Sequence, residues 1–180
     1  MKTRTGTAWI TTLILAALVV PGCGGGDGNG DPTGTIPAPQ PGPTVVELRP
    51  TASSYRIGEA VTIDVMIRDG RDVGSVPFHL HYDPSVVTFL PPAQEGPFLS
   101  ADGTATVFLA ADLSGDELVV GMSRLGGTVG AEGSGALATI EFMAVGAGDC
   151  GFRFSSASVK DPQARTLPAD FNAGAVAVAP

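Results

Sequence analysis

The chain has 180 residues, of which 43% are hydrophobic and 16% are charged, and its 10 basic and 18 acidic side chains give a net charge of −8 at pH 7. This acidic balance argues against nucleic acid as a partner and against electrostatic attraction to anionic lipid. The length fits one domain with a single core and additional terminal segments.

Residues 1–22 have the pattern of a secretory signal peptide. Two basic residues precede an apolar run over residues 8–20, and that run is too short to span a bilayer comfortably as a helix. The tetrapeptide VPGC at residues 20–23 resembles the bacterial lipobox, which predicts that Cys23 becomes the lipidated first residue of the mature protein. The alternative is ordinary cleavage that leaves Cys23 as a free thiol.

A lipidated Cys23 predicts a protein that is secreted and attached to the cell envelope through its lipid only. Gly24 stands where an aspartate would resemble an inner-membrane retention signal. In a Gram-negative cell we therefore expect the outer membrane, with the domain facing the periplasm or the exterior. Removal of the signal peptide takes Lys2 and Arg4 away, which leaves 8 basic against 18 acidic residues, a net charge of −10.

Residues 23–44 are predicted to be a flexible linker rich in glycine and proline, since such a composition cannot bury enough apolar surface to fold. The spacing of Asp27, Asn29 and Asp31 imitates the start of an EF-hand calcium loop. Pro32 and Ala38 stand where that loop needs glycine and glutamate, so we interpret the segment as a tether.

Residues 45–180 are predicted to form one all-β domain. Several runs alternate between apolar and polar residues, as where Val61, Ile63 and Val65 fall on one face and Thr62 and Asp64 on the other. The pattern predicts a nine-stranded antiparallel jelly-roll β-sandwich. The nine predicted runs, separated by turn-forming residues, are 45–50, 60–69, 76–83, 86–92, 104–112, 117–125, 135–145, 150–159 and 173–179.

The chain's two histidines, His79 and His81, lie two residues apart within one predicted strand. If Phe78, Leu80 and Tyr82 point into the core, both imidazoles share the outer surface, because side chains alternate along a strand. A zinc site would need further ligands that converge on the same place. The sequence offers no third histidine, so we predict no metal site and no cofactor, and expect histidines that face solvent or a partner.

Catalytic patterns are weak. Residues 121–125, GMSRL, resemble half of a nucleophile elbow around Ser123, but the second glycine and the strand-to-helix turn are missing. A triad of Ser123, His81 and an aspartate would have to arise by folding alone. Asp112, Asp116 and Glu117 are explained by a polar hairpin turn. We predict no catalytic residues and therefore a protein that is not an enzyme.

The second cysteine of the chain, Cys150, has no partner for a disulfide once Cys23 is assigned to the lipid. It lies in an apolar run, and a buried, unreactive thiol is the expected state.

Three stretches of the domain resemble those of cohesin domains. HLHYDPSVVTFL (residues 79–90) looks like their third and fourth strands, GSGALATIEFMAV (133–145) like a later strand after a Gly-rich loop, and FNAGAVAVA (171–179) like the closing turn and strand. The likeness extends in order over residues 45–179. It implies the nine-stranded jelly roll that cohesins share with cellulose-binding modules. It also implies a non-catalytic receptor for dockerin modules, classically those of polysaccharide-degrading enzymes.

The resemblance also implies a location for the partner. In cohesins the dockerin lies across the face that includes the third, fifth and sixth strands. Family members that bind type-I-like dockerins tend to have Asn and Asp at the positions of Ser75 and Pro77, so a different partner is expected here. The implied partner-binding face of this chain comprises Ser75, Pro77, His79, His81, Arg124 and Gly127.

Two alternatives to a dockerin-like partner remain. One is direct binding of a polysaccharide, which usually needs a row of exposed aromatic rings. Trp9 leaves with the signal peptide, and the domain retains only Tyr55 and Tyr82 besides phenylalanines that suit a core. The other is an envelope scaffold without a small ligand, for which an exposed apolar residue on the strand around Phe108 and Leu109 would be an indication.

Overall fold

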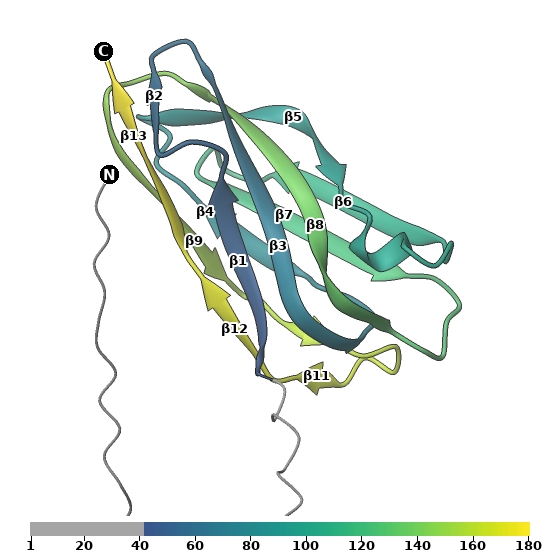
Figure 1. The fold of residues 1–180 in the computed structure, drawn as a ribbon. Coiled ribbons are helices and arrows are strands. Elements are labelled where there is room, and N and C mark those ends of the chain that lie inside the picture. The colour runs from purple at the N-terminus through teal and green to yellow at the C-terminus, as the bar shows by residue number, and fades with distance from the viewer. Residues whose placement is uncertain (1–41) are drawn as a thin grey trace, which may run out of the picture. The chain divides into compact units, whose positions relative to one another are not determined.

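Strands dominate residues 42–180, the part of the chain that this computed structural model describes (Figure 1). All nine predicted strands form: β1 (Thr44–Pro50), β3 (Ala60–Val73), β4 (Phe78–His81), β5 (Val87–Glu95), β6 (Thr106–Asp112), β7 (Glu117–Arg124), β8 (Ala131–Ala144), β9 (Gly148–Ser155) and β13 (Gly174–Ala179). The signal peptide, Cys23 and the linker up to residue 41 lie outside the described residues.

Four short strands and one turn of 3-10 helix were not predicted: β2 (Ser54–Arg56), β10 (Val159–Lys160), β11 (Thr166–Leu167), β12 (Ala169–Asn172) and η1 (Phe98–Ser100). Runs of two to four residues are too short to show a period in the sequence. No helix within residues 42–180 has the length and apolar character needed to cross a membrane.

The strands form two sheets that pack face to face (Figure 1). One sheet has the order β12-β1-β3-β8-β5 and the other the order β2-β13-β9-β4-β7-β6, while β10 and β11 form a separate small ladder. The predicted all-β jelly-roll sandwich is therefore confirmed. Most pairs are antiparallel, and the short strands β12 and β2 add two parallel pairings, with β1 and with β13.

Alternation along β3 divides its side chains between the core and the surface. Val61, Ile63, Val65 and Ile67 are fully buried, whereas the residues between them are partly exposed. Strands β4 and β7 follow the same rule from the opposite sheet, with Phe78, Leu80, Leu118, Val120 and Met122 pointing inward. The two inner faces interdigitate to form one hydrophobic core, as expected for aligned sheets.

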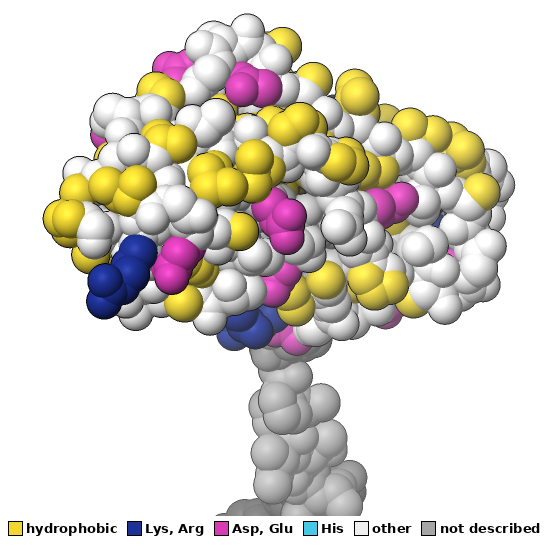
Figure 2. Space-filling model, turned by 90° about the horizontal axis from the view of Figure 1, so that it is seen from above, with side chains coloured by type: hydrophobic (Ala, Val, Ile, Leu, Met, Phe, Trp, Pro, Cys, Tyr) yellow, Lys and Arg dark blue, Asp and Glu magenta, His cyan; other side chains and the backbone are white. Residues whose placement is uncertain are grey.

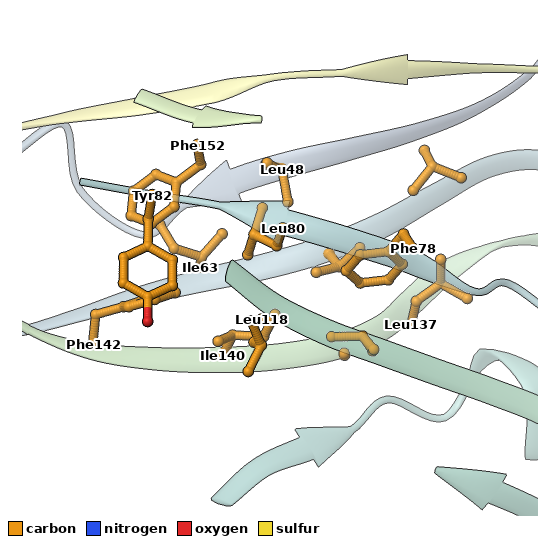
Figure 3. Close-up of a cluster of buried hydrophobic side chains, with 14 of the residues drawn as sticks. Leu48, Ile63, Phe78, Leu80, Tyr82, Leu118, Leu137, Ile140, Phe142 and Phe152 are labelled. Carbon is orange, nitrogen blue, oxygen red and sulfur yellow. The ribbon is translucent and has the colours of Figure 1, made fainter. Parts of the chain in front are cut away.

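An aromatic cluster lies at one end of this core, with Phe142 of β8 at its centre (Figure 3). The centroid of the Phe142 ring lies 4.9 Å from the ring centroid of Tyr82, 5.1 Å from that of Phe152 and 6.0 Å from that of Phe89. The contacts are edge-on or tilted, which is the arrangement that aromatic quadrupoles favour. Tyr82 and Phe152 come from the other sheet, so the cluster joins the two layers.

Tyr82 extends from this cluster toward Asp112 at the end of β6. Its phenolic hydroxyl donates a hydrogen bond of 3.1 Å to Asp112 Oδ2. Burial, reinforced by the negative charge of Asp112, raises the pKa of Tyr82 well above its usual range. The Tyr82 phenol therefore stays protonated in the folded domain at pH values where it ionises in the unfolded chain.

We predict that the stability of the domain falls as the pH rises above about 10, the usual pKa of tyrosine. Above that pH the folded state binds more protons than the unfolded state, so stability decreases with rising pH. Tyr82→Phe is expected to make this decrease shallower, and urea unfolding between pH 8 and pH 11 measures it. An equally steep decrease in Tyr82→Phe would contradict the assignment to Tyr82.

Cys150, the one cysteine within residues 42–180, is fully buried in β9. The backbone N–H of Asp83 contacts its Sγ at 3.4 Å. Burial raises the pKa of the thiol, which disfavours the reactive thiolate. The prediction of a buried thiol is confirmed.

Candidate functional site

Strand β4 presents both histidines on the outer surface of the six-stranded sheet. Phe78 and Leu80 are fully buried, and His79 and His81, which alternate with them, are partly exposed, so the predicted orientation of the pair is confirmed. No histidine side chain is visible on the face drawn in Figure 2.

Cross-strand register gives the two histidines three polar neighbours and one apolar neighbour. On β7, His79 pairs with Val119 and His81 pairs with Glu117. On β9, the partners are Ser155 for His79 and Arg153 for His81. Because side chains of paired residues point to the same side of a sheet, all of them share the outer surface.

Glu117 lies between the two imidazoles. Its Oε1 is 2.6 Å from His79 Nδ1 and 3.5 Å from His81 Nε2. His81 Nε2 also lies 2.7 Å from the hydroxyl oxygen of Ser155. These four side chains form a polar cluster, with Arg153 of β9 beside it on the same surface. The importance of Glu117 and Ser155 was missed in the sequence, because their proximity to the histidines depends on strand register.

The polar cluster does not have the geometry of a catalytic triad. In a triad the serine and the carboxylate contact opposite nitrogens of the histidine ring. Here Ser155 and Glu117 both approach His81 through Nε2. Ser123, the serine considered in the sequence, instead donates a hydrogen bond to the Arg124 carbonyl oxygen. Within residues 42–180 no three His, Cys, Asp or Glu side chains are arranged to hold a metal ion.

The carboxylates of residues 112–117 mostly support the hairpin turn between β6 and β7, as predicted. Asp112 Oδ1 accepts hydrogen bonds from the backbone N–H groups of Ser114, at 3.2 Å, and Gly115, at 2.7 Å. Asp116 accepts a hydrogen bond from the Ser114 hydroxyl. Only Glu117, the first residue of β7, turns toward the histidines.

An apolar strip lies beside the polar cluster on the same surface. On β6, Val107 and Leu109 are 50% and 60% exposed, whereas Phe108 packs partly against the core. Leu109 pairs with Gly121 of β7, where an added Cβ would meet no atom within 4 Å. The strip is therefore bordered by a flat position. The outward residues of β4, β7 and β6, which we call the histidine face, are His79, His81, Glu117, Val119, Gly121, Ser123, Val107, Leu109 and Ala111.

Ser75, Pro77 and Gly127 lie toward the other end of β4. Ser75 forms isolated bridges with Ser123 and Lys160, so it continues the six-stranded sheet beyond β4. The Pro77 carbonyl oxygen accepts a hydrogen bond of 3.1 Å from Ser158 N–H. Gly127 is exposed in the loop after β7. Ser75 and Gly127 both line a small cavity of about 140 Å³, away from the His79–His81 pair.

Arg124 was expected on the partner-binding face, but its side chain is only 5% exposed and forms its hydrogen bonds inside the domain. It has the same parity along β7 as the buried Met122 and points toward the segment before β6. Its guanidinium donates to the Leu99 carbonyl oxygen at 2.6 Å, to Asp102 Oδ2 at 2.6 Å and to Thr104 Oγ1 at 2.8 Å. Arg124 is thus unavailable to a partner and secures the connection between η1 and β6.

The hydrogen bonds from Arg124, with a contribution from Thr104, hold the pKa of Asp102 well below its usual range. Asp102 is 58% exposed, so solvent screens its ion pair and this pair alone contributes little to stability. The hydrogen bond to the buried Leu99 carbonyl contributes more to stability, because a buried acceptor without a donor is costly.

We predict that Arg124→Ala lowers the free energy of unfolding by about 2–3 kcal/mol, because the Leu99 carbonyl loses its donor and the segment before β6 loses its anchor. The stability of Arg124→Lys should lie between that of the parent chain and that of Arg124→Ala, since an ammonium group cannot form all the hydrogen bonds of the guanidinium group. Urea unfolding measures both. Arg49→Ala, which removes a largely exposed arginine paired with Glu47, is the control with little expected effect. An equal loss in Arg49→Ala would contradict the anchoring role.

No protein-family model and no curated protein matches this sequence. Solved structures of cohesins do match the fold. A non-cellulosomal cohesin from the hyperthermophilic archaeon Archaeoglobus fulgidus aligns with a TM-score of 0.62 at 15% identity, over 77% of this chain and 93% of that chain. The second type II cohesin module of the cellulosomal adaptor scaffoldin ScaA from Acetivibrio cellulolyticus aligns with a TM-score of 0.65 at 14% identity, over 77% and 98%.

A third match is a type II cohesin–X-dockerin complex, also from Acetivibrio cellulolyticus, with a TM-score of 0.64 at 12% identity, over 76% of this chain and 99% of that chain. In that structure a cohesin is held together with a dockerin. Sequence identities this low establish a shared fold but do not identify a binding partner. The described part of the chain has the cohesin fold.

Proposed function

We propose that residues 42–180 are the receptor of a two-part docking system and bind a dockerin-like protein module on the histidine face. The observation that carries the proposal is the exposed apolar strip of Val107 and Leu109, bordered by the flat position at Gly121 and lying in the same surface as the polar cluster. An apolar centre with polar groups around it is the usual composition of a protein interface.

The polar cluster would give the interface its specificity. His79, His81, Glu117 and Ser155 already bond to one another, so their orientation is set before a partner arrives. Imidazoles both donate and accept hydrogen bonds, and a hydroxyl or amide of the partner could join the network. A rigid receptor surface loses less conformational entropy on binding than a mobile one.

The burial of the aromatic side chains is an argument for a protein partner rather than a crystalline polysaccharide. The ten aromatic side chains within residues 42–180 are all buried or partly buried, and none belongs to the exposed large hydrophobic residues. A flat row of exposed rings, the usual platform for such a polysaccharide, is therefore not formed by the described residues. We further propose, from the resemblance of residues 79–90, 133–145 and 171–179 to cohesin domains, that the partner is joined to a polysaccharide-degrading enzyme.

We further propose that Cys23 is lipidated and that residues 23–41 tether the domain to the cell envelope, at the outer membrane in a Gram-negative cell. The lipobox-like VPGC sequence supports this arrangement. Cys23→Ser is expected to move the protein from the membrane fraction to the soluble fraction after cell lysis. Retention of Cys23→Ser in the membrane fraction would contradict anchoring through this cysteine.

The docking proposal is tested by affinity capture with the chain from Gly24 to Pro180 as bait, on secreted and envelope extracts of the source organism. We expect a protein with paired calcium-binding loops, lost from the bait when a chelator is added. A parallel assay uses a panel of polysaccharides. Retention on a polysaccharide without any captured protein would contradict the docking proposal.

A further inference from the structure

The two sheets end in four edge strands, and three of them are protected against pairing with another chain. β2 has three residues, and β12 has four and includes the exposed Asp170. β5 contains Pro91 and Pro92, and its register with β8 shifts between Leu90 and Gln94. Short length, charge, proline and bulges are the devices by which edge strands avoid intermolecular pairing.

Strand β6, the fourth edge, has none of these devices within its first six residues. Its sequence, TVFLAAD, contains no proline and has one charge, on the last residue, Asp112. It pairs with β7 in one continuous register from Thr106 to Asp112. Among the described residues, the main chain of residues 106–111 makes no other hydrogen bond, so half of its N–H and C=O groups face outward along the edge.

The side chains of β6 are as accessible as its backbone. Val107 and Leu109 are at least half exposed on the outer surface of the sheet. Phe108 and Ala110, on the inner surface, are only partly buried against the core. A strand added beside β6 would cover apolar area on both surfaces of the sheet, in addition to pairing the free N–H and C=O groups.

We propose that a second copy of the domain pairs with this edge, with the two β6 strands antiparallel around a two-fold axis at Leu109. In that register Leu109 lies opposite its own counterpart, Val107 opposite Ala111, and Thr106 opposite Asp112. No charge faces a like charge, and the apolar residues of the two outer surfaces meet. The two six-stranded sheets then form one continuous sheet, and the closed two-fold arrangement prevents further growth through this edge.

Such pairing goes beyond the docking proposal and is compatible with it. Edge pairing uses the N–H and C=O groups in the plane of the sheet and the edge-facing sides of Val107 and Leu109, whereas the docking proposal uses the outer surface that these side chains share with β7 and β4. A dimer would present two histidine faces side by side on one continuous sheet. Two linked receptors bind a divalent partner more tightly than one, provided that the spacing of the partner's sites matches.

The test is sedimentation equilibrium of the chain from Gly24 to Pro180 with single substitutions on β6. The parent chain is expected to dimerise reversibly. Leu109→Lys and Leu109→Glu should each weaken dimerisation at least about tenfold, because two like charges then lie directly opposite across the axis. An equimolar mixture of the two variants should recover a heterodimer. Ile57→Lys, at a comparably exposed apolar residue outside β6, is the control that should dimerise like the parent chain.

Leu109 is highly exposed, so both variants should fold like the parent chain, and circular dichroism checks their folding. Recovery of the heterodimer supports the proposed register at Leu109. A parent chain that stays monomeric at several hundred micromolar would overturn the proposal, as would a mixture that stays monomeric. Dimerisation is measured without any partner, so its failure would leave the docking proposal untouched, and the reverse also holds.

Discussion

Replacing Phe142 by alanine is expected to lower the free energy of unfolding by about 3–5 kcal/mol, the range for removing a large buried aromatic side chain. The Phe142 ring is fully buried and contacts the ring of Phe89 as well as those of Tyr82 and Phe152, which Figure 3 labels. Its loss removes buried apolar area and leaves a cavity between the two sheets, which the surrounding strands cannot close without losing their pairing.

Urea or thermal unfolding measures this effect. Phe171→Ala is the matched control, because Phe171 lies on the short edge strand β12, is only partly buried and has one aromatic neighbour, Phe154, at 5.3 Å. We expect about 1–2 kcal/mol for this substitution. Equal losses for the two variants would contradict the central role of Phe142 in joining the sheets.

The strands around this cluster could be predicted because their sequences carry a strong period of two. Along β3, every second residue from Val61 to Ile67 is apolar, and burial follows that order. The short strands β2, β10, β11 and β12 are set by pairing with longer neighbours. Their two to four residues contain no period of their own, so the sequence alone could not show them.

The alternation of buried and exposed residues along a strand also explains which parts of the candidate site could be predicted. It placed His79 and His81 outside, because Phe78 and Leu80 are apolar and lie between and beside them. Arg124 was wrongly placed on the partner-binding face although the signal was present. It shares its parity on β7 with Val120 and Met122, which are buried, so alternation points its side chain inward.

Contacts between strands that are distant in sequence could not be predicted from the alternation of apolar and polar residues. Glu117 reaches the histidines only because β7 pairs with β4 in one particular register, and Ser155 does so through β9. The strand TVFLAAD is apolar on both sides, so its sequence could not tell which side would face the core. The hypothesis that Phe108 or Leu109 is exposed was confirmed for Leu109.

Gly121→Arg is expected to weaken binding of the captured partner at least about 100-fold, or about 2.7 kcal/mol. Gly121 lies between the apolar strip and the polar cluster, and a long cationic side chain there would hold a partner away from both. The domain itself should tolerate the change. An added Cβ at Gly121 meets no atom within 4 Å, and a strand loses little when its glycine is replaced.

Gly151→Arg provides the matched control. Gly151 is likewise a strand glycine with no atom within 4 Å of an added Cβ, but it lies on β9 beside β13, outside the histidine face. Titration calorimetry with the captured partner should show near-normal affinity for Gly151→Arg. Unfolding of both variants should remain within about 1 kcal/mol of the parent chain. Normal affinity in Gly121→Arg would place the partner on another surface, whereas equal losses in both variants would indicate a general effect of added positive charge on this acidic domain.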